Sequence, residues 1–101
     1  MFPTKINICG IPFKIVLCKD NFVSDTIHFG EIDYKKGEIR IDEEMPIPLK
    51  EQTLTHEWLH GVLFMIGQDE LRANEQLVQG IAMAIYQTFR LKEGEGEYGS
   101  N

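Results

Sequence analysis

Apolar residues in the first part of the chain recur at every second position, which is the period of a β-strand. In residues 5–18 a glycine and a proline interrupt this alternation, and the apolar positions on either side are Ile6, Ile8, Phe13, Ile15 and Leu17. Residues 27–42 keep the same period around the turn signal Lys35-Lys36-Gly37, at Ile27, Phe29, Ile32, Tyr34, Ile39 and Ile41. The pattern predicts two pairs of strands, each joined by a turn.

The second part of the chain has the spacing of helices. Residues 43–49 contain two prolines, which cannot lie inside a central strand or a helix, so they predict a connector. Residues 49–66 predict a first helix, whose last five residues, VLFMI, are apolar on every side and therefore predict burial. Gly67 is a natural helix stop, and Asp69 can cap a second helix over residues 69–91, which has apolar residues three and four apart.

These elements predict one α+β domain over residues 1–92, in which a small, mostly antiparallel sheet of about four strands packs on two antiparallel helices. Residues 93–101 are acidic and glycine-rich, have little to bury, and predict a mobile tail. No secretion signal precedes Cys9 and Cys18, so we expect reduced core thiols and a cytoplasmic protein.

Charge and composition narrow the classes of partner. The chain is 43% hydrophobic and 26% charged, as in ordinary folded proteins, and its formal net charge is -6. Binding to a phosphate backbone requires clustered lysine and arginine, so we expect no nucleic-acid partner. No stretch approaches the length of a membrane span, so we also expect no membrane partner.

The sequence THEWLHG, residues 55–61, is a candidate metal site in the predicted first helix. Helical residues four apart lie on one face, so His56 and His60 can share an ion. Glu57 is displaced by about 100° and can take a proton from metal-bound water without binding the metal. The alternative, an accidental motif, would leave two imidazoles in an otherwise apolar helix, where unpaired polar groups are costly.

A catalytic zinc ion takes a third protein ligand and keeps a fourth position for water. Three carboxylates follow the motif, at Asp69, Glu70 and Glu75. The first helix continues about 10 Å beyond the ion, so a carboxylate at the turn is too distant. A second helix that returns antiparallel brings Glu75 back by about 9 Å, level with His60. The alternative for Glu75 is a solvated residue near a helix start.

The hairpin GEIDYKKGEIRID and the helical stretches LTHEWLHGVL and NEQLVQGIAMAIY together resemble the ImmA/IrrE-like zinc metallopeptidases, in particular their short stand-alone phage and prophage members. The likeness covers roughly residues 27–90. It implies a minimal zincin-like fold and one zinc ion per chain, held by His56, His60 and Glu75. It also implies that Glu57 is the catalytic base.

The motif and the resemblance predict a zinc-dependent peptidase that hydrolyses a peptide bond in a protein substrate, with phage or host regulators as candidates. We expect the substrate to bind as an extended strand along a sheet edge formed by residues 37–42. Side chains available to stabilise an oxyanion are His28, Tyr34 and Tyr86. The alternative function is a zinc-stabilised, catalytically inactive protein-binding module, which would keep the same ligands.

Overall fold

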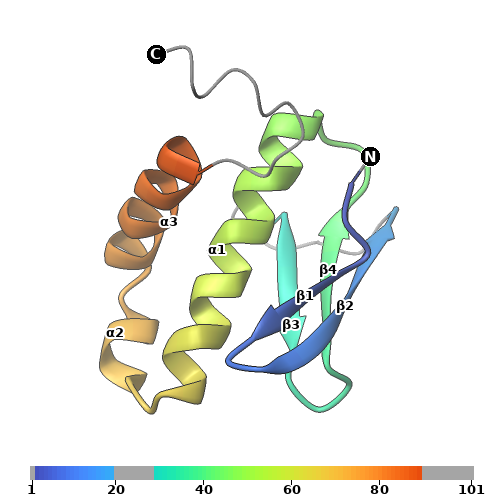
Figure 1. Ribbon diagram of the computed structural model, residues 1–101. Coiled ribbons are helices and arrows are strands. Elements are labelled where there is room, and N and C mark those ends of the chain that lie inside the picture. Colours follow the sequence, from blue (N-terminus) through green and yellow to red (C-terminus); the bar gives the residue numbers. More distant parts are fainter. Residues whose placement is uncertain (1, 20–28, 90–101) are drawn as a thin grey trace.

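The computed structural model describes residues 2–19 and 29–89 of the chain. In these two described stretches, four strands precede three helices (Figure 1) in the order β1 (Lys5–Ile8), β2 (Ile11–Cys18), β3 (Gly30–Asp33), β4 (Glu38–Asp42), α1 (Ile47–Met65), α2 (Asp69–Ala73) and α3 (Glu75–Phe89). This arrangement confirms the predicted α+β class. The predicted tail over residues 93–101, and the predicted strand positions of Ile27 and His28, lie outside the described residues.

The four strands form one sheet in the order β1-β2-β4-β3. Both predicted hairpins are present as antiparallel pairs, β1 with β2 and β3 with β4, and the hairpins join through a parallel pairing of β2 with β4. The sheet is therefore mostly antiparallel, as predicted. The prediction that residues 37–42 form an edge was wrong, because β2 and β3 flank β4 on its two sides. The edge strand at that end of the sheet is β3.

Helix α1 packs across one face of the sheet, and two glycines allow a close approach. A Cβ added at Gly61 would lie 2.7 Å from Ile8 Cδ1 and 3.1 Å from Ile32 Cδ1. A Cβ added at Gly30 would lie 2.8 Å from Thr53 Cγ2, so β3 also needs a glycine where it meets the helix. The fully buried side chains between the layers include Ile8, Phe13, Ile39, Ile41 and Leu54. This packing holds β3 directly beside the motif-bearing part of α1.

The apolar end of α1 is less buried than its composition predicts. Phe64 is 40% exposed and Ile66, just beyond the helix, is 56% exposed, so the prediction of a buried VLFMI segment was wrong. The buried residues of α1 lie earlier, between Thr53 and Gly61. A helix covered by one sheet and by neighbouring helices keeps a solvent side, so a segment that is apolar all round cannot be buried all round.

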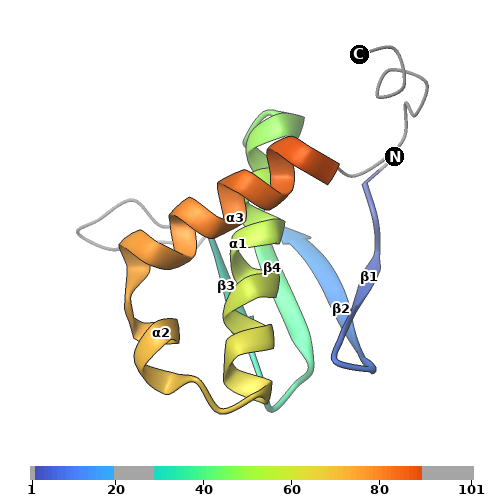
Figure 2. The ribbon, with the colours of Figure 1, turned by 60° about the vertical axis from the view of Figure 1, so that its left-hand side comes forward.

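The predicted single second helix is two helices. Asn74 has an extended backbone, with φ -88° and ψ 90°, and separates α2 from α3. Its side-chain Oδ1 accepts a hydrogen bond from Leu77 N at 3.1 Å, so it caps the start of α3. Helix α3 then runs back along α1 in the opposite overall direction (Figures 1 and 2) and buries Val78 and Ala82 near Leu59.

Both cysteines are free thiols. Cys18 is half-buried, but Cys9 is exposed and has a left-handed backbone, φ 50°, next to Gly10. The prediction that Cys9 is a core residue was therefore wrong, because Cys9 lies in the turn between β1 and β2. None of the described helices combines the length and the apolar character that a membrane crossing requires.

Candidate metal and catalytic site

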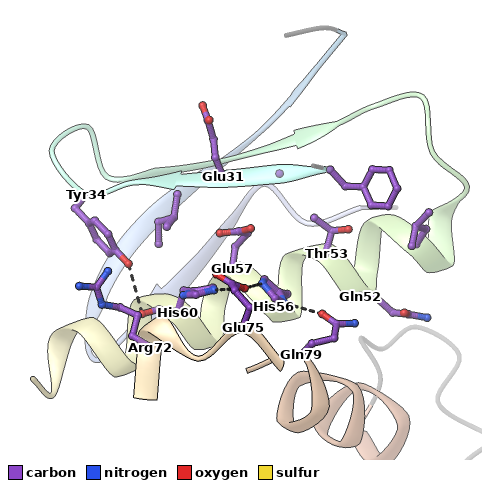
Figure 3. Close-up of a pocket in the computed structure, with 14 residues that line it drawn as sticks. Glu31, Tyr34, Gln52, Thr53, His56, Glu57, His60, Arg72, Glu75 and Gln79 are labelled. Atoms are coloured by element: carbon purple, nitrogen blue, oxygen red, sulfur yellow. Dashed lines mark hydrogen bonds and ion pairs between the residues drawn. The ribbon is translucent and has the colours of Figure 1, made fainter. Parts of the chain in front are cut away.

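Two histidine side chains of α1 and the first side chain of α3 converge on one point (Figure 3). His56 Nε2 lies 3.2 Å from Glu75 Oε1, and His60 Nε2 lies 3.3 Å from the same oxygen. One ligand atom from each of the three residues lies within 4.8 Å of the others. The structure thus brings together His56, His60 and Glu75, and these residues could hold a metal ion.

The route by which Glu75 reaches the histidines differs from the predicted one. The chain turns after α1 at Gly67, whose φ of 77° favours glycine, and then forms the short helix α2. The extended residue Asn74 redirects the chain, so Glu75 enters the site from the first turn of α3. Asp69 instead pairs with Arg72 at 3.3 Å, and Glu70 is exposed. Of the three carboxylates considered from the sequence, only Glu75 joins the histidines.

His56 makes a second contact on the other side of its ring. Its Nδ1 lies 2.7 Å from Gln79 Oε1. An amide oxygen only accepts hydrogen bonds, so this contact places the proton on Nδ1 and leaves Nε2 to face Glu75. Gln79 was not recognised as a partner of His56 from the sequence. Its spacing of four residues from Glu75 on one helix is the signal that could have found it.

The His60 ring is 11% exposed, and burial lowers its pKa. Contact with Glu75 opposes this effect, but burial is the larger cause. His60 is therefore a neutral imidazole at neutral pH, and the proton of its Nε2 tautomer donates to Glu75 Oε1 at 3.3 Å. The Nδ1 proton of His56 instead points to Gln79, so the Nε2 lone pair of His56 faces the same carboxylate oxygen. A cation at this point satisfies both groups, so the donor set fits a metal ion.

Glu57 lies between α1 and β3, beside the three converging side chains (Figure 3). Its Cγ is 3.7 Å from the position of a Cβ added at Gly30, which shows how closely the strand covers it. Burial, together with the smaller effects of the Glu75 and Glu31 charges, raises the pKa of Glu57 to about 7. A carboxyl group with this pKa can both accept and release a proton near neutral pH.

These residues line a cavity of ≈ 810 Å³ between β3, α1 and the residues from α2 to the start of α3. The end near the start of α1 is lined by the uncharged residues Phe29, Leu49, Gln52 and Thr53. The opposite end is lined by Tyr34 and Arg72 (Figure 3). The cavity therefore has two chemically different ends, with the histidines and Glu57 between them.

Tyr34 is the one predicted oxyanion candidate that lines the cavity in the described part of the chain. Its hydroxyl donates to His60 O at 3.4 Å, and its ring stacks on Phe64 with centroids 4.0 Å apart. Burial raises the pKa of Tyr34, so the hydroxyl keeps its proton at neutral pH. Tyr86 instead donates to Glu51 Oε1 at 2.8 Å, and His28 lies outside the described residues.

Comparisons with protein-family models, with curated proteins and with solved structures found no match to this chain. The site geometry and the residues that form it therefore carry the functional argument.

Proposed function

We propose that this protein is a zinc-dependent peptidase of the ImmA/IrrE-like type, which hydrolyses a peptide bond in a protein substrate. The observation that carries the proposal is the convergence of His56 Nε2 and His60 Nε2 on Glu75 Oε1, with the carboxyl group of Glu57 beside them in an open cavity. Two imidazoles and one carboxylate form a common ligand set of catalytic zinc, which keeps a further position for water or substrate.

His56, His60 and Glu75 would hold one zinc ion per chain. When bound, zinc polarises the substrate carbonyl and lowers the pKa of water toward about 7. Gln79 orients the His56 ring by accepting a hydrogen bond from Nδ1–H, an arrangement that raises ligand basicity in many metal sites. Glu75 is 68% exposed in its side chain, so metal binding has to order it more than it orders the two less exposed imidazole rings.

Glu57 acts as the general base and then as the general acid. It takes a proton from the attacking water and delivers that proton to the leaving amine. Its raised pKa supports both transfers, because neither protonation state is strongly disfavoured near pH 7. A bound cation would favour the ionised form of Glu57, which is the state that accepts a proton.

The substrate binds as an extended strand on the free edge of β3. Asp42 N donates to Phe29 O at 2.9 Å. In an antiparallel pair every second residue bonds to the neighbouring strand, so this bond shows which residues of β3 bond to β4. Phe29, Glu31 and Asp33 therefore direct their backbone groups toward β4, while Gly30 and Ile32 direct theirs to the free edge. Both residues line the cavity, so a peptide paired with them would cross the site.

The resemblance to phage and prophage peptidases makes regulatory proteins of the phage or its host the first substrates to test. It also places the reaction in the host cytoplasm as part of the proposal. A zinc-stabilised binding module is the alternative, because it needs the same three ligands and the same strand edge. The two functions differ in whether Glu57 moves a proton.

The test compares wild-type protein with Glu57→Gln. Glutamine has nearly the same shape but cannot take a proton, so zinc content and folding are retained while cleavage falls by about 10² to 10⁴. Glu70→Gln is the matched control, because Glu70 is exposed and outside the cavity. Zinc stoichiometry, melting temperature and cleavage of a panel of phage and host regulators are measured side by side. Equal cleavage by Glu57→Gln rejects its role, and zinc binding without any cleavage favours the binding module.

A further inference from the structure

The cavity contains one cationic side chain among its described lining residues. Arg72, on α2, lies at the end that also contains Tyr34, whereas the acidic residues Glu31, Glu57 and Glu75 line other parts of the cavity. The chain as a whole is acidic, with a formal net charge of -6. A fixed positive charge at one end of an otherwise acidic cavity favours a negatively charged group of a ligand at that end.

Packing holds the Arg72 guanidinium in place. Its Cζ lies 5.3 Å from the centroid of the Phe64 ring, the same ring on which Tyr34 stacks. Its Nε is buried and has no hydrogen-bond partner among the described residues. Its one described ion pair, with Asp69 at 3.3 Å, involves a side chain that is 73% exposed. Solvent screens such a pair, so Asp69 neutralises Arg72 only weakly.

The direction of β3 shows which part of a substrate passes Arg72. Gly30, at the start of β3, meets Thr53, and Ile32 meets Gly61, so β3 and α1 run in the same direction. Tyr34 then follows beyond His60. A peptide that pairs antiparallel with β3, the commoner and slightly more stable pairing, runs the opposite way. Its residues N-terminal to the cleaved bond therefore pass Tyr34 and Arg72 (Figure 3).

We propose that Arg72 is a specificity-determining residue, which binds the carboxylate of an Asp or Glu side chain on the N-terminal side of the cleaved bond. The inference rests on the proposed peptidase function and names a class of substrate for it. A guanidinium offers paired N–H donors that match a carboxylate, and that of Arg72 lies over the Phe64 ring. The Tyr34 side chain, whose hydroxyl donates to His60 O, lines the same end of the cavity.

A first experiment measures binding. The probes are fluorescein-labelled decapeptides of Thr and Ala, amidated at the C-terminus, with a single Glu placed at each position in turn, and the matched Gln peptides. The protein is zinc-loaded Glu57→Gln, so that bound peptide stays intact. We expect Glu at one or two adjacent positions to bind roughly tenfold tighter than Gln, the order expected for a charge-assisted contact. The double variant, with Arg72→Gln added to Glu57→Gln, should bind the Glu and Gln peptides equally.

Three further variants test whether Arg72 contacts the peptide or only packs within the protein. Arg72→Lys keeps the charge without the planar fork and should keep part of the preference. Asp69→Asn removes the competing carboxylate and should strengthen binding of the Glu peptide by about twofold. Lys36→Gln, at an exposed site outside the cavity, removes an equal charge and should change nothing. A Glu preference that survives Arg72→Gln in a folded protein, no Glu preference, or no binding by any peptide would overturn the proposal.

A second experiment uses cleavage to locate the carboxylate. Wild-type protein should cut the tightly bound Glu peptides on the C-terminal side of the Glu. Preference for a Glu C-terminal to the cut, or for a free C-terminal carboxylate over the amide, would overturn the assigned position. Arg72-dependent binding of Glu peptides without cleavage by wild type would reject the peptidase function alone. Failure of the Arg72 proposal and failure of the proposed function therefore give different results.

Discussion

The Nδ1 atom of His56 on α1 lies 2.7 Å from the Oε1 atom of Gln79 on α3. A side chain of α3 therefore orients a candidate ligand of α1, while Glu75, one turn earlier on α3, meets the opposite side of the same ring. The two contacts together determine which ring nitrogen faces the candidate metal position.

This relationship predicts the effect of Gln79→Ala. We expect zinc affinity to fall by about tenfold or more, because loss of a partner that orients a ligand histidine commonly costs 10- to 100-fold. Chelator competition gives the affinity. Gln76→Ala is the matched control, because Gln76 is an exposed amide on the same helix outside the cavity. Equal affinities for the two variants would mean that the Gln79 contact has no orienting role.

Because Glu75 lies on α3 and the two histidines lie on α1, we expect zinc binding to stabilise the packing of α3 on α1. Zinc should raise the free energy of unfolding by about 2.7 kcal/mol when free zinc is about 100 times the Kd. Glu75→Ala should reduce this gain strongly, whereas Glu70→Ala should not, because only Glu75 meets the histidines. Thermal unfolding with zinc and with a chelator measures both gains. Similar zinc responses in the two variants would exclude Glu75 as a ligand.

The free edge of β3 predicts different results for two substitutions of Ile32. Ile32→Pro removes a backbone N–H that points away from β4, so the sheet should form but binding of an extended peptide should be lost. Ile32→Ala loses similar packing and keeps the donor, so it should retain peptide binding in a fold of comparable stability. Peptide affinity and circular dichroism are measured for both. Retained binding in folded Ile32→Pro would place the substrate elsewhere.

The raised pKa of Glu57 predicts how the stability of the metal-free protein depends on pH. Folding raises this pKa from 4.5 to about 7, so the folded state binds more protons than the unfolded state between these values. The free energy of unfolding should therefore decrease as pH rises from about 4.5 to about 7 and then change no further from this group. The total loss is on the order of 3 kcal/mol for a shift of this size.

The variant Glu57→Gln isolates that contribution, because the other groups titrate in both proteins. Relative to wild type, it should be equally stable near pH 4.5 and more stable by on the order of 3 kcal/mol at pH 8. Urea unfolding in the presence of a chelator at both pH values gives the difference. A difference that does not grow with pH would show that folding does not raise the pKa of Glu57.

The sequence by itself determined the features that depend on local spacing. Alternating apolar residues identified both hairpins, and the four-residue spacing of His56 and His60 placed the two rings on one helical face. The antiparallel return of a second helix also identified Glu75 as the carboxylate nearest the histidines. The structure brings Glu75 to the histidines although Asn74 interrupts the predicted helix. The reason is that Glu75 lies at the start of α3, and α3 packs against α1.

Only the tertiary structure decided which strand forms the edge and which side chains complete the cavity. Residues 37–42 looked suitable as an edge, but pairing with β2 buried that strand, and a hairpin pattern does not specify which of its strands has a second neighbour. Arg72 belongs to a short helix with no motif, and it reaches the cavity because α2 packs beside α1. Contacts between residues distant in sequence depend on how whole elements pack, and the period of a single element contains no information about that packing.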